Sequence, residues 1–352
     1  MNEFAWASAV GHIRIKEREI LSRADLMRLV EAADLERAVL ALRDTFYGPF
    51  FAAVSPQEHG KALVAALSEA YGYALEISPE PMLIVAYRAR NDFHNLKVRA
   101  KSLQLDTPLD KEALSPLGNF GADLHPDETL SEAERLLGSR VSKKEIASFC
   151  DTLGQTYRQA VELIEGSRES THEGLLSLRV DSLIDRRYYD WFARVFRRYG
   201  YAGLRVFQKA EVDLVNLRIS MRGLRMGLAP ELFEEVILPG GDVPAGKILG
   251  AYKDGFSGIS TVFRGTPWES LAVSGAQAAE KRESLTRWER SCDNALMGVV
   301  RNAKYYSIGP EPVFGYLFAK ENEVRNLRVI LSGKESDLPA QEIAERLRET
   351  YV

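Results

Sequence analysis

Apolar positions recur along most of the chain with the spacing of an α-helix. Across 24–46 they fall three or four residues apart, which places them on one face of a helix. The same spacing predicts further helices over 142–163, 178–198, 284–303 and 339–351. Ser142 is followed three residues later by Glu145, an arrangement that caps helix N-termini. Few segments alternate with period two, so we expect an all-α protein.

Two stretches interrupt this helical pattern. Residues 107–126 contain Pro108, Pro116, Gly118, Gly121 and Pro126, too many helix breakers for a continuous helix. Residues 238–250 read LPGGDVPAGKILG and interrupt the pattern again. The interruptions leave three pieces of similar length, and we predict helical repeat domains over 1–118, 119–241 and 242–352.

An internal repeat supports that division. Each predicted domain contains an acid, an Asn three residues later, then Leu, then a base. The three copies are Asp92, Asn95, Leu96 and Lys97; Asp213, Asn216, Leu217 and Arg218; and Glu323, Asn326, Leu327 and Arg328. An apolar frame with i, i+3, i+7 spacing accompanies each copy and lies on one face of a helix. Three copies on one frame indicate three related helical modules.

The repeated Asn has two interpretations. As a functional group, it would form part of a polar triad that binds a ligand or performs catalysis. As a packing motif, it would hydrogen-bond the backbone of a neighbouring helix or loop, while the acid orients the amide or pairs with a base on an adjacent helix. We favour the packing motif, because buried Asn is best documented as a device that sets register. Catalytic residues also rarely recur in three domains of one chain.

Residues 241–247 match the phosphate-loop pattern GxxxxGK. Ile248 stands where a hydroxyl residue would have to bind magnesium, and Pro244 lacks a backbone N–H that could contact phosphate. The residues before the pattern predict a helix, although a phosphate loop follows a strand. The sequence therefore argues against a nucleotide site.

Candidate metal and catalytic residues are equally weak. The five histidines have no metal-binding spacing, and there is no GxSxG nucleophile motif. Asp181 and Asp185 lie one helical turn apart, as do Glu289 and Asp293. A divalent ion at Asp181 and Asp185 is the enzyme alternative, but charged pairs at this spacing are usually solvated or salt-bridged. We predict a protein with no catalytic residue, cofactor or metal.

An aromatic cluster in 188–196 is flanked by arginines, a composition that can stack on nucleic-acid bases. On a helix, however, Tyr188, Trp191, Phe192 and Val195 form an ordinary core stripe, and most of the arginines lie opposite. The net charge of −4 is too small to indicate a nucleic acid or an anionic membrane as partner. We expect no nucleic-acid partner, although such a surface can still bind protein.

Composition indicates a globular protein of the cytoplasm. Hydrophobic residues make up 45% of the 352 residues and charged residues 27%, which is ordinary for folded domains. Cys150 and Cys292 cannot build a disulfide framework and have no metal-ligand spacing. No signal peptide is evident, and the apolar stretches are too short to span a bilayer. We therefore expect no direct bilayer span.

Several segments resemble a known family. They are 211–218 with Arg222 and Gly223, then 238–241, and, most closely, 309–320, 323–328 and 330–334. They are similar to the C subunit of the archaeal and bacterial V/A-type rotary ATPases, the counterpart of the d subunit of the eukaryotic V-ATPase. The likeness spans nearly the whole chain and is weakest over 48–80 and 115–141.

The resemblance implies an all-α funnel of three related helical domains around a pseudo-threefold axis. It implies a peripheral protein on the cytoplasmic face of the membrane, bound to the membrane proteolipid ring and to the D and F subunits of the central shaft. Its role would be a non-catalytic rotor adaptor that transmits torque for proton or sodium transport. The main competitor is a helical-repeat scaffold for another partner, whose repeats would normally be about 20–50 residues long. The repeats here exceed a hundred residues.

Overall fold

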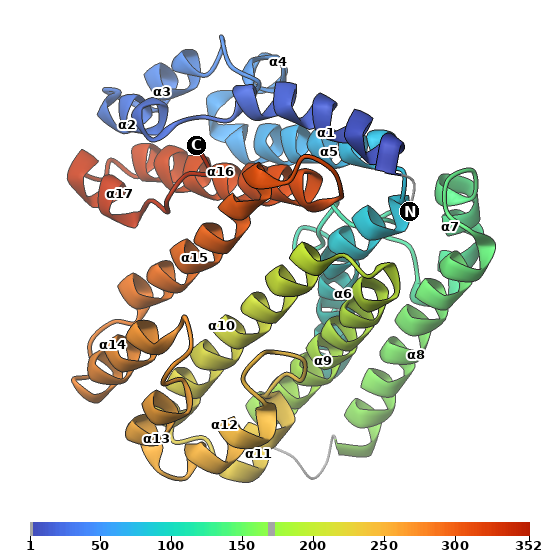
Figure 1. Ribbon diagram of the computed structural model, residues 1–352, viewed down its shortest axis with the longest axis vertical. Coiled ribbons are helices and arrows are strands. Elements are labelled where there is room, and N and C mark those ends of the chain that lie inside the picture. The colour runs from blue at the N-terminus through green and yellow to red at the C-terminus, as the bar shows by residue number, and fades with distance from the viewer. Residues whose placement is uncertain (1–2, 168–172) are drawn as a thin grey trace. The chain divides into compact units, whose positions relative to one another are not determined.

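Every regular element is a helix within residues 3–167 and 173–352, the part of the chain that the computed structural model describes (Figure 1). The all-α class predicted from the sequence is therefore confirmed. The chain forms two compact units, one of Met1–Pro79 with Glu289–Val352 and one of Glu80–Trp288. The division into domains 1–118, 119–241 and 242–352 stays a prediction.

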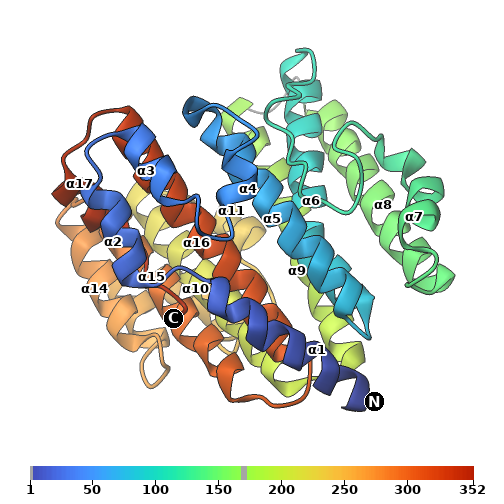
Figure 2. The same cartoon turned by 90° about the horizontal axis from the view of Figure 1, so that it is seen from above.

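The first unit is built around α16 (Glu311–Glu335), a helix buried on most of its sides. Helices α1, α2, α3 and α5 pack against it, as Figure 2 shows from above. The other helices of this unit follow in chain order. They are α1 (Glu3–Lys16), η1 (Glu17–Glu19), α2 (Arg23–Glu31), α3 (Leu35–Ala41), α4 (Gly48–Phe51), η2 (Pro56–Glu58), α5 (His59–Ile77), most of α15 (Thr286–Arg301), η4 (Asn302–Tyr305) and α17 (Ala340–Arg346).

The second unit has an aromatic core where α6 packs against α8 and α9. The Phe149 and Trp191 rings stack with centroids 4.6 Å apart, and Phe93 lies 5.5 Å from Tyr188. Of the predicted core stripe, Tyr188, Trp191 and Phe192 are buried, and Val195 is half-buried. The helices of this unit are α6 (Pro81–Leu105), η3 (Pro126–Glu128), α7 (Thr129–Leu137), α8 (Lys143–Ser167), α9 (Glu173–Tyr199), α10 (Ala202–Met226), α11 (Pro230–Val236), α12 (Ala245–Tyr252), α13 (Gly255–Val262) and α14 (Glu269–Glu280).

Three of the predicted helices correspond closely to observed ones. The predictions over 142–163, 178–198 and 284–303 match α8, α9 and α15. The expected cap of α8 is present, because the Glu145 N–H donates to Ser142 Oγ at 3.3 Å. Cys150 and Cys292 are buried and are not joined in a disulfide.

Two predicted helices are wrong in extent. The helix expected over 24–46 is two helices, because the Asp34 side chain accepts a hydrogen bond from the Arg37 N–H at 2.7 Å and caps a new start. The helix expected over 339–351 ends at Arg346. Beyond it the chain is extended, and the backbone of Arg348 bonds to a side chain of α16 in place of the next helical turn.

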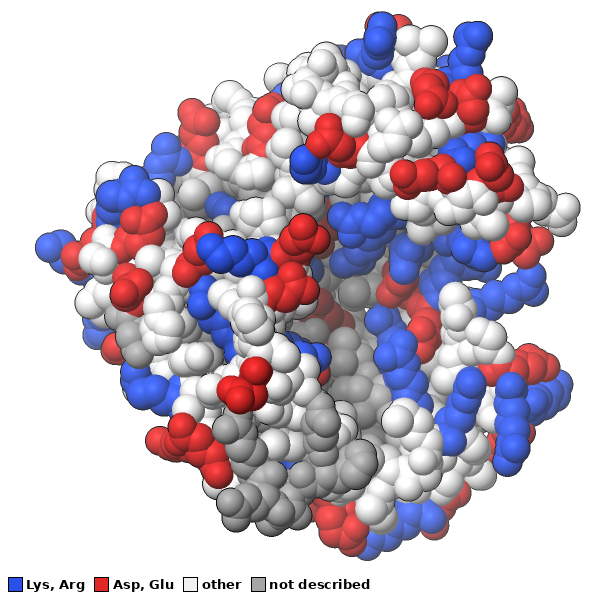
Figure 3. Space-filling model, turned by 180° about the vertical axis from the view of Figure 1, so that it is seen from behind, with Lys and Arg blue, Asp and Glu red and all other residues white. Residues whose placement is uncertain are grey.

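No helix in the described ranges is long and apolar enough to cross a membrane. On the face drawn in Figure 3, Lys and Arg side chains are interspersed with Asp and Glu. This mixture agrees with the small net charge of −4.

Candidate functional site

The three motif helices share their length and their way of ending. Helices α6, α10 and α16 have 25 residues each. After each helix the chain turns through a residue with positive φ: Asp106 (52°), Gly227 (67°) and Asp337 (52°). The next N–H donates to a carbonyl five residues back, from Thr107 to Ser102 (3.0 Å), Leu228 to Gly223 (2.8 Å) and Leu338 to Gly333 (2.9 Å). This is the Schellman turn. After each of the three helices, it directs the chain back alongside that helix.

The motif Asn of each helix binds the returning segment through both ends of its amide. In every case Oδ1 accepts from the N–H, and Nδ2 donates to the carbonyl, of one and the same residue. The pairs are Asn95 with Ser115 (2.7 and 3.0 Å), Asn216 with Leu238 (2.8 and 2.8 Å), and Asn326 with Arg348 (2.9 and 3.1 Å). These are the backbone hydrogen bonds expected of a buried Asn. They fix which residue of the returning segment lies beside the motif Asn, and so the register of that segment against its helix.

The motif acids of α6 and α10 bind the same segments a few residues further on. Asp92 accepts from the Asn119 N–H at 2.9 Å and from Asn119 Nδ2 at 2.7 Å. Asp213 accepts from the Val243 N–H at 3.1 Å and from Trp268 Nε1 at 3.3 Å. The expectation that the acid orients the amide or pairs with a base on an adjacent helix is therefore wrong for these two. Their hydrogen bonds come from backbone N–H groups and neutral side chains, and the Arg88 guanidinium of the same helix α6 also acts on Asp92.

Burial dominates the electrostatics of these two carboxylates. It raises the pKa of Asp92 to about 6, although the hydrogen bonds from Asn119 act in the opposite direction. Burial also raises the pKa of Asp213, against the hydrogen bonds from Val243 and Trp268. Both carboxyl groups thus accept hydrogen bonds from neutral donors in a site from which water is largely excluded, and the charge of Arg88 lowers the pKa of Asp92 without cancelling the effect of burial.

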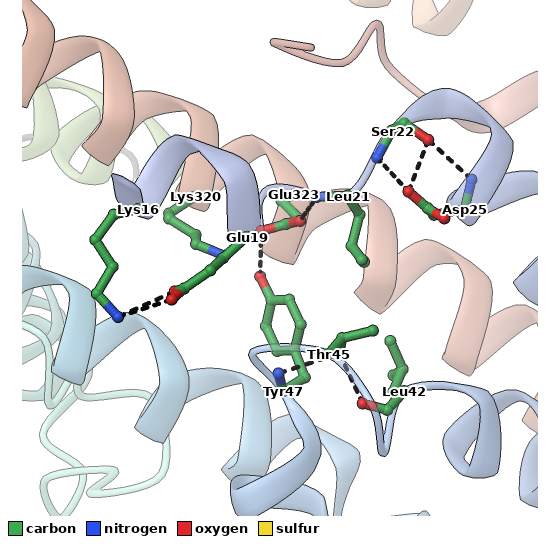
Figure 4. Close-up of polar contacts among 10 residues, drawn as sticks. All are labelled: Lys16, Glu19, Leu21, Ser22, Asp25, Leu42, Thr45, Tyr47, Lys320 and Glu323. Atoms are coloured by element: carbon green, nitrogen blue, oxygen red, sulfur yellow. Dashed lines mark hydrogen bonds and ion pairs between the residues drawn. The ribbon is translucent and has the colours of Figure 1, made fainter. Parts of the chain in front are cut away.

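Glu323 of α16 is bound differently, as Figure 4 shows. It accepts hydrogen bonds from the Leu21 N–H, from Tyr47 Oη at 2.7 Å and from Lys320 Nζ at 2.8 Å. The Lys320 side chain is 1% exposed, and its Nζ lies 4.1 Å from the centroid of the Phe46 ring. The acid of the third helix therefore binds the first part of the chain and not the segment that follows its own helix.

Tyr47 and Trp268 belong to a second repeat, which is absent from the sequence-based predictions. Thr45 Oγ1 donates to the Leu42 carbonyl at 2.6 Å and accepts from the Tyr47 N–H at 3.2 Å. Thr266 makes the same two bonds, to Phe263 at 2.7 Å and from Trp268 at 3.2 Å. The signal was present in the sequences LRDTFY (42–47) and FRGTPW (263–268). Each turn aims an aromatic donor at a motif carboxylate, a position that Asn119 fills for Asp92.

The paired aspartates of α9 are salt-bridged. Asp185 lies 2.6 Å from Nζ of Lys97, the base of the first motif, and Asp181 lies 3.0 Å from Nζ of Lys101. Asp293 of the other acidic pair lies 2.8 Å from Arg348. Within the described ranges, no group of three His, Cys, Asp or Glu side chains could hold a metal ion.

The segment with the phosphate-loop spelling is part of the Asp213 contact. The N–H groups of Asp242 and Val243 donate to that carboxylate at 3.3 and 3.1 Å. Helix α12 begins at Ala245, so Gly246 and Lys247 lie inside it. These backbone donors are consequently not available to a phosphate.

Comparison with known proteins gives a family for the chain. A sequence model described as "ATP synthase (C/AC39) subunit" matches residues 9–346. The C subunit of the A-type ATP synthase of Methanocaldococcus jannaschii is 26% identical, over 97% of this chain and 86% of its own length. The C subunit of the V-type sodium ATPase of Enterococcus hirae is 24% identical, over 96% of this chain and 97% of its own length.

Proposed function

We propose that this chain, which belongs to the ATP synthase (C/AC39) subunit family, is the non-catalytic rotor adaptor of a V/A-type ATPase or ATP synthase. In this role it links the D and F subunits of the central shaft to the membrane proteolipid ring and transmits torque for ATP-coupled proton or sodium transport. The observation that carries the proposal is the family match over residues 9–346. Relatives named as the C subunits of A-type and V-type complexes, aligned over more than nine-tenths of this chain, support it.

The contacts at the motif helices are those that a torque-transmitting part needs. Such a part must resist shear between neighbouring segments. Each of the three 25-residue helices is fixed to its returning segment by a two-point amide contact, and in α6 and α10 by a carboxylate as well. Buried, fully paired polar groups of this kind rigidify a fold. In the proposed role, the motif residues maintain stiffness and bind no substrate.

We further propose that the protein is peripheral and lies on the cytoplasmic face of the membrane. The proteolipid ring would then hold it there through protein contacts. Its nearly balanced charge, with 46 Lys and Arg against 50 Asp and Glu, suits a surface that meets other proteins without strong self-repulsion.

Co-purification from native membranes tests the proposal. The tagged chain, extracted in mild detergent, should bring down the proteolipid together with the D and F subunits. In cells that lack the chain, the catalytic part should still hydrolyse ATP, but membrane vesicles should no longer pump ions. Adding back the purified chain should restore pumping. The proposal is wrong if the tagged chain captures neither ring nor shaft, or if vesicles without it still pump.

Two alternatives give different results in the same preparations. A helical scaffold for another partner would co-purify with proteins outside the ATPase. An enzyme with a metal at Asp181 and Asp185 would be stabilised by divalent ions in a melting experiment. The salt bridges from those residues to Lys101 and Lys97 disfavour the second alternative, and the adaptor should show no such stabilisation.

A further inference from the structure

A groove of about 430 Å³ runs along the first unit beside α16 and the extended segment that follows α17. Four arginines line it: Arg325, Arg328, Arg346 and Arg348. Ser332 and Ser336 also line it. Val329, Gly333 and Leu338 complete its wall, so guanidinium groups stand beside apolar surface. Guanidinium groups bind carboxylates in a bidentate geometry.

Three of the four arginines are paired with acids of this chain. Arg348 Nε lies 2.8 Å from Asp293, and Arg346 pairs with Glu342 on its own helix. Arg325 lies 3.8 Å from Glu321, a loose pair. Arg328 is exposed and has no hydrogen-bond or ion-pair partner among residues 3–167 and 173–352. The groove therefore presents one guanidinium group without a protein partner in the described ranges, that of Arg328, and a second that is weakly paired, that of Arg325.

The first motif helix shows which group pairs with the base at this motif position when another helix packs over it. Lys97 of α6 is the equivalent base, and it pairs at 2.6 Å with Asp185 of α9. One turn further along α6, Lys101 pairs at 3.0 Å with Asp181 of the same helix. Helix α9 therefore presents two carboxylates, one turn apart, to the lysines on this face of α6.

Helix α5 packs against α16 but contributes no such carboxylate. Its polar contacts with α16 include Tyr71 Oη to Glu321 and His59 to Glu335 at 3.3 Å. Glu321 and Glu335 lie seven residues before and after Arg328. Between these two contacts, Arg328 and Ser332 are exposed.

We propose that the Arg325, Arg328, Arg346 and Arg348 groove binds an acidic segment of a partner protein, whose carboxylate pairs with Arg328 as Asp185 pairs with Lys97. A protein segment is favoured over a free phosphate because the lysines on the equivalent face of α6 are paired with two aspartates one turn apart on a packed helix. The inference rests on the proposed function in one respect: that function says in which complex the partner protein should be sought. The chemistry of the groove does not depend on that function.

Cross-linking identifies the occupant. The full chain carrying p-benzoylphenylalanine at position 328 is irradiated in intact cells, and the cross-linked peptide is identified by mass spectrometry. The expected product is a segment of another protein with two or more Asp or Glu residues within one helical turn. The same probe at position 264, which is exposed in the other unit, is the control and should not give that product. A cross-link to a segment without carboxylates, or only to this chain, contradicts the proposal.

Charge reversal measures the contribution of the arginines. Arg325→Glu with Arg328→Glu should weaken retention of the cross-linked partner by about tenfold or more, as expected when a close interfacial charge pair becomes repulsive. The matched control, Arg205→Glu with Arg264→Glu, makes the same charge change at exposed arginines of the other unit and should retain the partner. Lysines in place of the partner's carboxylates should restore binding to the reversed chain.

The outcomes separate this inference from the proposed function. If the unaltered chain captures neither ring nor shaft, the proposed function fails, while the cross-link at position 328 still tests the groove. If the unaltered chain captures them and the doubly reversed variant keeps every partner at all salt concentrations, the groove proposal fails and the function stands. The proposal of a protein partner is also wrong if inorganic phosphate binds the groove and no acidic peptide is cross-linked at position 328.

Discussion

Helices α6 and α16 contain the same motif, yet only half of its contacts are the same. In both, the Asn bonds to the backbone of a residue on the returning segment, Ser115 and Arg348. The acids differ: Asp92 binds Asn119, 27 residues away, while Glu323 binds Leu21, 302 residues away. The amide contact is thus local in both helices, whereas the acid can serve either the local segment or a distant one.

A glycine explains the difference. Three residues after Ser115 stands Gly118, where an added Cβ would overlap Asp92 Oδ1. The backbone can therefore reach the carboxylate only with Gly at this position. Three residues after Arg348 stands Tyr351, whose hydroxyl donates to Glu17 at 2.9 Å. The segment after α16 instead accepts from Asn322 Nδ2 through the Glu349 carbonyl at 2.8 Å, and Leu21 and Tyr47 supply the donors for Glu323.

Removing the distant acid should have the largest effect. Glu323→Ala leaves the ammonium group of Lys320, a side chain 1% exposed, without its partner. A broken buried ion pair costs about 3–5 kcal/mol, so the free energy of unfolding should fall by that amount in urea titrations. Hydrogen exchange at the Leu21 amide should accelerate at the same time.

The control replaces the whole pair. Lys320→Met combined with Glu323→Leu removes both charges and should recover most of the lost stability, because apolar residues of similar volume often substitute well for a buried pair. If Glu323→Ala lowers the free energy of unfolding no more than this double variant does, the different partners of the α6 and α16 acids do not affect stability.

Removing the shared amide should have the next largest effect. Asn326→Ala strands the N–H and carbonyl of Arg348, and Asn95→Ala strands those of Ser115. An unpaired buried group costs about 1–3 kcal/mol, and these backbone groups are partly buried. We expect a loss of about 3 kcal/mol at Asn326, which is 0% exposed, and a smaller loss at Asn95, which is 7% exposed.

Hydrogen exchange decides whether the loss is local. Amide exchange should accelerate at Arg348 in the first variant and at Ser115 in the second, with little change at the other site. Equal acceleration at both sites in either variant would contradict the idea that each amide fixes only its own segment.

The amide half of the site could be predicted from the sequence, and the acid half could not. An Asn on the edge of an apolar stripe must find hydrogen-bond partners, so its three copies indicate backbone contacts. A backbone donor such as the Leu21 N–H has no signature in the sequence, and it meets Glu323 across 302 residues. The aromatic donors Tyr47 and Trp268 did have a signature, the repeated Thr-x-aromatic turn.

The two predicted helices were too long because apolar periodicity does not reveal individual hydrogen bonds that end or restart a helix. Apolar periodicity continues past Arg346, but tertiary hydrogen bonds from Asn326 hold Arg348 in an extended conformation. Periodicity likewise continues across Asp34, where one side-chain cap starts a new helix. Single contacts of about 1 kcal/mol overrule a periodic pattern at such points, although they leave the helical class unchanged.

The pH dependence of stability tests the environment of Asp92. Its folded pKa of about 6 lies above the ordinary 3.8, so the folded state binds the proton more tightly. This contribution to stability is fully present below about pH 4 and is lost as the pH rises through 6. Relative to Asp92→Asn, the unaltered protein should lose about 2 kcal/mol of unfolding free energy between pH 4 and pH 7. Parallel curves for the two proteins would show that burial does not control this carboxyl group.

The smallest expected effect comes from the glycine that lets the local segment reach its acid. Gly118→Ala places a methyl group against Asp92 Oδ1, whereas at Gly121, three residues on, an added Cβ has nothing within 4 Å. The first change should cost about 1–2 kcal/mol through overpacking, and the second should stay within about 0.5 kcal/mol. Exchange at the Asn119 amide should accelerate only in the first variant, because there the backbone is pushed away from the carboxylate. Equal costs at the two glycines would mean that close approach is not what separates α6 from α16. A loss of stability at Gly118 alone would mean that a side chain at this position keeps the backbone away from the acid. The α6 repeat would then resemble the α16 repeat, where Tyr351 stands at the matching position.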